Sequence, residues 1–143
     1  MNSTHATKKS EQKYNWHFIN ADNKVLGRLS AGICVLLTGK NKVNYVPYLN
    51  MGDKVVVYNS KKIAVTGTKE LHKMYYSHSG TVGNLRTKNL GQVREHNSKR
   101  IILDSITGML PKNRLRNDRL ANLYIYEDDK HPHSAQMKGA TNE

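Results

Sequence analysis

Cysteine is almost absent from the sequence, because Cys34 is the only one among 143 residues. A single cysteine excludes an internal disulfide framework and a zinc site built from four cysteines. No stretch approaches the roughly 20 consecutive apolar residues that a membrane-spanning helix needs. Residues 1–15 contain no apolar run, so they do not form a secretory signal peptide. These absences argue against disulfide-rich secreted proteins and helical membrane proteins.

Acidic residues are scarce as well. The chain carries 23 Lys and Arg against 11 Asp and Glu, which gives a formal net charge of +12 at pH 7. Such an excess of one sign is typical of a protein with a polyanionic partner and is unusual for an enzyme of small metabolites. The length suits one domain, because it allows a sizeable core but is too short for two full domains.

Motifs of nucleotide chemistry are missing too. The segment from Gly32 to Lys40 has six residues between its two glycines instead of four, and Asn41 stands where a phosphate-binding loop has Ser or Thr. The Gly-x-Gly-x-x-Gly dinucleotide motif, the Cys/His zinc finger and the basic leucine zipper are absent. No side chain stands in a nucleophile context, so we expect no catalytic residue and no cofactor.

The nearest approach to a metal-binding motif is His131-Pro132-His133, which follows Asp128 and Asp129. A metal site needs three or four ligands that converge on one point, and this polar segment does not predict convergence. We therefore expect no metal. Cys34 lies among apolar residues and is interpreted as a packed side chain.

Apolar periodicity predicts an α/β domain. Apolar residues recur at steps of three and four from Val25 to Leu37, which predicts a helix with Gly39 as its stop signal. The run Val55-Val56-Val57 is typical of a central strand covered on both faces. The remaining patterns predict helices over 87–96, 99–110 and 114–123, strands over 17–20, 54–58, 61–66 and 124–126, and an extended segment with a glycine-rich loop over 72–86. Strands that alternate with helices indicate a layered fold.

Basic residues gather in the connecting segments. Residues 86–119 hold nine Lys and Arg against three Asp and Glu. Arginine binds phosphate oxygens in a fork and stacks on bases. A second basic segment interleaves cations with aromatic rings that suit stacking on unpaired bases: Lys40, Lys42, Tyr45 and Tyr48. This distribution predicts a nucleic-acid partner, and its spread over several loops favours a folded RNA over one DNA groove.

Six blocks of sequence follow one another in order from about Trp16 to Gln136. They comprise residues 20–29, 45–47 with 52–53, 62–67, 73–80, 108–112 and 131–136, of which Gly108-Met109-Leu110-Pro111-Lys112 is the most distinctive. Together they resemble the bacterial-type ribosomal protein L-thirteen family of the large (50S) subunit. The sequence departs from the family after Lys112, where an arginine-bearing, helix-compatible segment replaces a proline turn.

The resemblance implies a non-catalytic structural constituent of the large subunit that binds 23S-type rRNA beside neighbouring ribosomal proteins, early in assembly. It implies a single three-layer α/β/α domain around a mostly parallel four-stranded sheet over residues 16–136, with basic loops and a polar C-terminal arm. We expect 1–15 to be a flexible basic tail and 137–143 a C-terminal tail. We also expect a cytoplasmic ribosome in preference to an organellar one, with no membrane, small-molecule substrate or homo-oligomer.

The rRNA-binding residues are expected among the cations, aromatic residues and histidines of the matching blocks and basic segments. They are Arg28, Lys40, Lys42, Tyr45, Tyr75, Tyr76, His78, Lys112, Arg114, Arg116, Arg119, His131 and His133.

Two other functions compete with this one. The same basic surface would suit a stand-alone regulator that binds mRNA or DNA, and an α/β scaffold would suit an enzyme that handles nucleotides. Stable sedimentation with large subunits distinguishes the ribosomal function from the regulator, and saturable ATP or GTP binding would indicate the enzyme.

Overall fold

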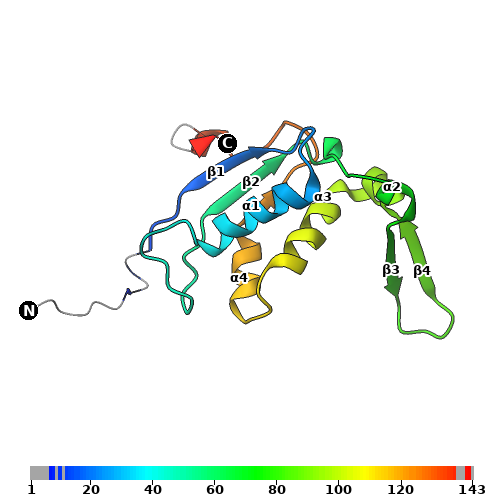
Figure 1. Cartoon of the computed structure of the whole chain (residues 1–143), viewed down its shortest axis with the longest axis horizontal. Coiled ribbons are helices and arrows are strands. Elements are labelled where there is room, and N and C mark those ends of the chain that lie inside the picture. The colour runs from blue at the N-terminus through cyan, green and yellow to red at the C-terminus, as the bar shows by residue number, and fades with distance from the viewer. Residues whose placement is uncertain (1–6, 9, 11, 138–140, 143) are drawn as a thin grey trace, which may run out of the picture.

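The computed structural model describes residues 7, 8, 10, 12–137, 141 and 142. The other residues of the two predicted tails, 1–6, 9, 11, 138–140 and 143, lie outside the described part. A parallel sheet forms the centre of the domain, two long helices cover one of its faces, and a two-stranded arm projects from the body (Figure 1). The prediction of a single α/β domain is confirmed.

The sheet has the strand order β5-β2-β1-β6. β1 (Trp16–Asn20) runs parallel to β2 (Lys54–Tyr58), and β5 (Leu123–Ile125) runs parallel on the other side of β2. The three valines of β2 are fully buried, as expected of a central strand. β6 (Thr141–Asn142) adds two residues in parallel register with β1.

Two helices cover one face of this sheet. α1 (Leu26–Thr38) and α3 (Leu90–Met109) bury their apolar faces against each other and against β1 and β2. Representative members of this core are Leu29, Ile33, Leu37, Val55, Val57, Ile102 and Ile106. On the opposite face lies the C-terminal segment, whose helix α5 (Ser134–Met137) is one turn long. The second helical layer that was expected is therefore a single turn within the described residues.

The chain turns sharply at the end of α1. Gly39 ends the helix in the left-handed region at φ 76°, as its stop-signal role predicts. The returning loop passes so close to α1 that a Cβ atom at Gly52 would lie 1.9 Å from the Leu37 carbonyl oxygen. This close approach fixes the basic loop 40–48 at the carboxyl end of α1.

The predicted strand over 61–66 is wrong. Asn59 takes a left-handed conformation at φ 61°, which turns the chain out of β2 into the 3₁₀ helix η2 (Ser60–Lys62). Ala64 then forms one isolated parallel bridge with Val25 at the entry to α1. Ile63 is buried in the core, so the apolar residues of this segment serve packing and not strand pairing.

The two helices predicted over 87–96 and 99–110 are one helix, α3, with a kink at Asn97. It begins after Asn89, whose side chain accepts a hydrogen bond from the Gln92 backbone N–H at 2.8 Å. The residues before this cap form β4 (Leu85–Asn89), which pairs antiparallel with β3 (Met74–His78). The predicted last helix is the shorter α4 (Leu115–Ala121).

The arm formed by β3 and β4 is fixed to the body only at its base. Leu90 is buried at the end of β4, and α2 (Lys69–His72) leads into β3. The Arg94 guanidinium binds both carboxylate oxygens of Glu70, at 2.8 and 3.0 Å, and also donates to the Lys61 and Ile63 carbonyls. These contacts hold α2, α3 and the core together, while the arm extends away from them (Figure 1).

Candidate nucleic-acid interface

The two faces of the arm differ in charge. Residues that are directly opposite in an antiparallel pair share a face, and successive residues alternate between faces. Tyr75 pairs with Lys88, and Ser77 pairs with Arg86, so these four side chains share one face, which we call the cationic face. Lys73 belongs to it as well, because its Nζ lies 5.3 Å from the centre of the Tyr75 ring. All lysines and arginines of residues 73–89 therefore lie on this face.

The cationic face is turned toward α3. A hollow of about 160 Å³ separates the two. The arm lines it with Tyr75, Tyr76, Ser77, Arg86 and Lys88, and α3 lines it with Val93 and Arg100. Burial raises the pKa of the Tyr75 phenol, so the ring stays neutral at pH 7. An extended strand with cations on one side and a helix on the other suits a polyanionic backbone.

A second group of cations lies at the opposite end of α3. Lys40 and Pro111 line one shallow hollow between the end of α1 and the turn from α3 to α4. Lys40, Lys112 and Arg114 are exposed, and none of the three forms an ion pair within the described part of the chain. Free cations from two segments that are about 70 residues apart in sequence therefore meet at this end of the molecule.

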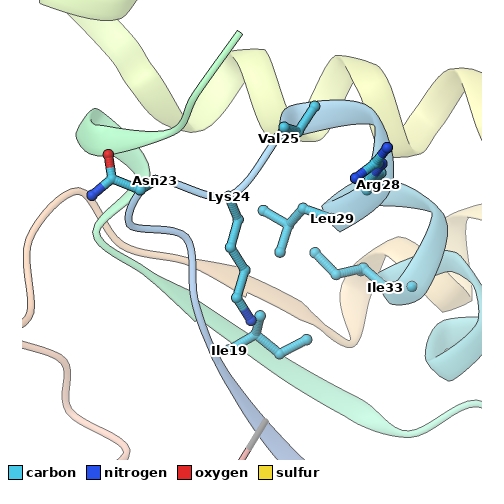
Figure 2. Close-up of a pocket in the computed structure, with 8 residues that line it drawn as sticks. Ile19, Asn23, Lys24, Val25, Arg28, Leu29 and Ile33 are labelled. Atoms are coloured by element: carbon cyan, nitrogen blue, oxygen red, sulfur yellow. The ribbon is translucent and has the colours of Figure 1, made fainter. Parts of the chain in front are cut away.

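Arg28 borders a third hollow, at the edge of the sheet next to β1. Figure 2 shows Leu29 and Ile33 of α1 pointing toward Ile19 of β1, with Lys24 extending across the space between them. The hollow has a volume of about 430 Å³, and Lys24 and Arg28 supply its positive charges. Neither cation has an ion-pair partner among the residues that the structure describes.

Lys42, in contrast, is engaged inside the protein. Its Nζ lies 2.5 Å from Oδ1 of the fully buried Asp53 and donates to the carbonyl oxygens of Lys13 and Met51, both at 2.8 Å. Asp53 also accepts from the Asn15 backbone N–H and lies 3.0 Å from His17 Nε2. Lys42 therefore holds the basic loop to β1, and its charge is not available to a phosphate. Tyr45, in the same loop, is half-buried.

Two of the predicted arginines also face inward. Arg116 is half-buried, and its Nη2 donates to the Thr107 carbonyl in the last turn of α3, where helix carbonyls lack an intrahelical partner. Arg119 is only 2% exposed, and its Nε has no partner in the described structure. Arg116 therefore joins α4 to α3, and Arg119 is buried, so of the three arginines over 114–119 only Arg114 is exposed to a ligand.

His131 and His133 pack against aromatic side chains on the second face of the sheet. The ring of His133 lies 5.2 Å from that of Trp16 and 4.7 Å from that of Tyr124, and a 3.0 Å hydrogen bond joins its Nε2 to the Tyr126 hydroxyl. His131 lies 5.4 Å from the Phe18 ring. These histidines attach the C-terminal segment to the sheet.

Acid is expected to loosen this attachment. Burial of the His133 ring lowers its pKa below the ordinary value of 6.5, and the nearby His131 and Lys54 lower this pKa further. Neutral His133 therefore stabilises the docked segment above about pH 6.5, and this contribution is lost as the pH falls through the lowered pKa. Trp16 is the only tryptophan, so its fluorescence should change as the pH falls below 6.5. His133→Phe keeps an aromatic ring without the titration, and a transition that persists in this variant would exclude His133 as its source.

Arg86, Lys88 and Arg100 belong to the basic segment 86–119, but the predicted rRNA-binding residues include neither these three nor Lys73. The available signal was the alternation of Arg86 and Lys88 with uncharged residues, which predicts a strand with cations on one side. The helix predicted over 87–96 hides this alternation. Tyr76 and His78, which are also predicted to bind rRNA, are exposed, and strand alternation places them on the other face of the arm.

The described residues contain no group of three or more His, Cys, Asp or Glu placed to hold a metal ion. Nor is any helix in the described part of the chain both long and apolar enough to cross a membrane.

Comparison with known proteins gives one consistent result. A profile of the family described as Ribosomal protein L13 matches residues 14–132. A protein of Syntrophotalea carbinolica is 46% identical over 135 residues, which cover 94% of this chain and 95% of the relative. Relatives from Staphylococcus saprophyticus and Ureaplasma parvum are 41% and 46% identical, covering 96% and 85% of this chain and 94% and 82% of their own lengths. Each of these relatives is named large ribosomal subunit protein uL13.

Proposed function

This chain belongs to the ribosomal protein L13 family, and on that basis we propose that it is a structural constituent of the large ribosomal subunit that binds large-subunit rRNA. The observation that carries the rRNA contact is the segregation of Lys73, Arg86 and Lys88 on one face of the arm, opposite Arg100. Cations fixed in this way neutralise phosphates that would otherwise repel one another when rRNA helices pack.

The proposed interface has two main parts. The cationic face of the arm and Arg100 hold one stretch of backbone, and the exposed cations Lys40, Lys112 and Arg114 hold another. Arg28 adds a contact at the hollow beside β1, with Lys24 as its neighbour. Lys42, Arg116, Arg119, His131 and His133 position these surfaces from inside the fold, and Tyr75 forms part of the wall of the arm hollow.

We further propose that the protein has no catalytic step, because fixing an rRNA junction needs charge and shape only. Its partners are then the large-subunit rRNA and the adjacent ribosomal proteins, it acts as a monomer, and its place is the cytoplasmic ribosome. We propose residues 16–136 as the body of the domain, and the register of β6 (Thr141–Asn142) beside β1 supports a fourth strand that the segment after residue 136 adds to its sheet.

Sedimentation tests the function. Tagged protein expressed in cells is expected to migrate with large subunits in a sucrose gradient and to remain there after a high-salt wash, because many phosphate contacts form together within a packed particle. A stand-alone mRNA or DNA regulator would be released by the wash to the top of the gradient. Saturable binding of ATP or GTP by the purified protein would instead favour the nucleotide enzyme.

A further inference from the structure

We propose that the hollow between the arm and α3 is a pocket for one unpaired base of the rRNA, turned out of its helix, while Arg86 and Lys88 hold the phosphates beside it. The inference rests on the proposed function and deepens it, because it names the part of the RNA that enters this site. A duplex backbone lying across the hollow would need cations only. The hollow also has an apolar wall, an unpartnered hydroxyl and a planar cation, which suit a base.

The hollow is small, and its inner wall is apolar. Its volume is about 160 Å³, whereas sites for drug-sized ligands measure about 300 to 1,000 Å³, so it admits one planar ring and excludes a base pair. Val93 lines it from α3 and is part of the core, with 4% of its surface exposed. The faces of a base gain from contact with this apolar wall, whereas a phosphate placed there would lose hydration without compensation.

The Tyr75 hydroxyl is a hydrogen-bonding group that lacks a partner. The Tyr75 side chain lines the hollow, and its buried hydroxyl forms no hydrogen bond with any residue that the structure describes. Burial raises the pKa of this phenol, and the charge of Asp104 raises it further, so the hydroxyl lies toward α3. Buried polar groups are nearly always hydrogen-bonded. The edge of a base carries the donors and acceptors that would satisfy this hydroxyl.

Arg100 supplies a planar group on the α3 side of the hollow. Its Nε lies 3.3 Å from a carboxylate oxygen of Asp104, and its guanidinium forms no other hydrogen bond within the described residues. Guanidinium planes stack on the faces of bases. Arg86 and Lys88, on the arm side, are exposed and have no ion-pair partner in the described part of the chain. These groups together complement a single nucleotide, with its base inward and its phosphates outward.

Two conservative substitutions distinguish a stacked base from a phosphate. Arg100→Lys keeps the positive charge and removes the planar group, and Arg86→Lys makes the same change at a position that we assign to phosphate. For a single-stranded RNA of about 12 nucleotides and mixed sequence, we expect Arg100→Lys to lower the affinity of the full chain roughly 5- to 10-fold and Arg86→Lys to lower it by no more than about 2-fold. Equal effects of the two substitutions, or an equal loss of affinity by Arg100→Lys for a duplex of the same sequence, would overturn the inference.

Tyr75→Phe tests the hydroxyl. Because this group has no partner in the protein, its removal should leave the melting temperature unchanged or slightly raised, and affinity for the same single-stranded RNA should fall roughly 3- to 5-fold. Unchanged affinity would show that the hydroxyl meets water only and would contradict its contact with a base.

Ultraviolet crosslinking tests the pocket inside the particle, because short-wave light joins bases directly to side chains that touch them. Large subunits that contain the tagged protein are irradiated and digested, and the crosslinked peptides are identified by mass spectrometry. We expect one nucleotide attached at Tyr75 or Tyr76, which both line the hollow. Subunits that contain the protein without this crosslink would overturn the inference and leave the proposed function intact. Subunits that lack the protein would refute the proposed function, and the inference with it.

Discussion

Replacing Lys73, Arg86 and Lys88 together with glutamine is expected to lower affinity for a large-subunit rRNA fragment by roughly 200- to 2,000-fold at low salt. Each lost cation removes one phosphate contact, and each such contact contributes about 1 to 1.5 kcal/mol under these conditions. The slope of log affinity against log salt should also become shallower by about 2 to 3, since fewer counterions are released on binding. All three side chains are exposed, so the fold should be retained.

The control for this variant removes the same charge from elsewhere on the surface. Lys62, Lys99 and Lys130 are exposed and lie outside the proposed interface, so their replacement with glutamine lowers the net charge equally. Titrations of both variants over a range of salt concentrations separate local contacts from overall charge. If the two variants lost affinity equally, rRNA would be responding to total charge, and the cationic face would have no special role.

Asp53→Ala should destabilise the protein by about 3 kcal/mol or more and lower the melting temperature by roughly 10 °C. The Asp53 carboxylate is fully buried and joins Lys42, His17 and the Asn15 backbone N–H in one cluster. Removing it leaves the Lys42 ammonium half-buried without its carboxylate and detaches the basic loop 40–48 from β1. Thermal and urea unfolding, followed by circular dichroism, measure the loss.

Asp104→Ala is the matched control, because Asp104 pairs with Arg100 one helical turn away on the surface of α3. Both side chains of this pair are about half exposed, and an ion pair of this kind contributes at most about 0.5 kcal/mol. The two aspartates therefore differ mainly in burial and in the number of groups that each one holds. An Asp53→Ala protein that melted within 2 °C of the unchanged one would contradict a structural role for the cluster.

The cluster around Asp53 shows why a lysine that the sequence predicts to bind rRNA can be engaged inside the protein instead. Lys42 and Lys40 are two residues apart in one basic loop, and their composition alone gives no reason to expect different roles for them. The folded chain brings the Asp53 carboxylate to Lys42 and leaves Lys40 in solvent. Long-range partners of this kind cannot be inferred from a local pattern, because they depend on how the loop returns past α1.

The same reason explains the errors in secondary structure. The β-branched segment 61–66 has the composition of a strand, but Asn59 turns the chain away and Ile63 is needed in the core. The helix expected over 87–96 begins only at Leu90, because pairing with β3 keeps the preceding residues extended. At both places the tertiary contacts override the secondary-structure propensity of the local sequence.

The sequence by itself determined the family, the α/β class, α1 with its glycine stop and the central strand β2, since these follow from motif order and from the spacing of apolar residues. It also determined the excess of positive charge, which is a property of composition. Only the tertiary structure decided which cations are free to bind and which are held inside. Arg114 is exposed, for example, whereas Arg119 is buried. Pairing of β3 with β4 likewise separated the charged from the apolar side chains of the arm, because strand register sets the face of every residue.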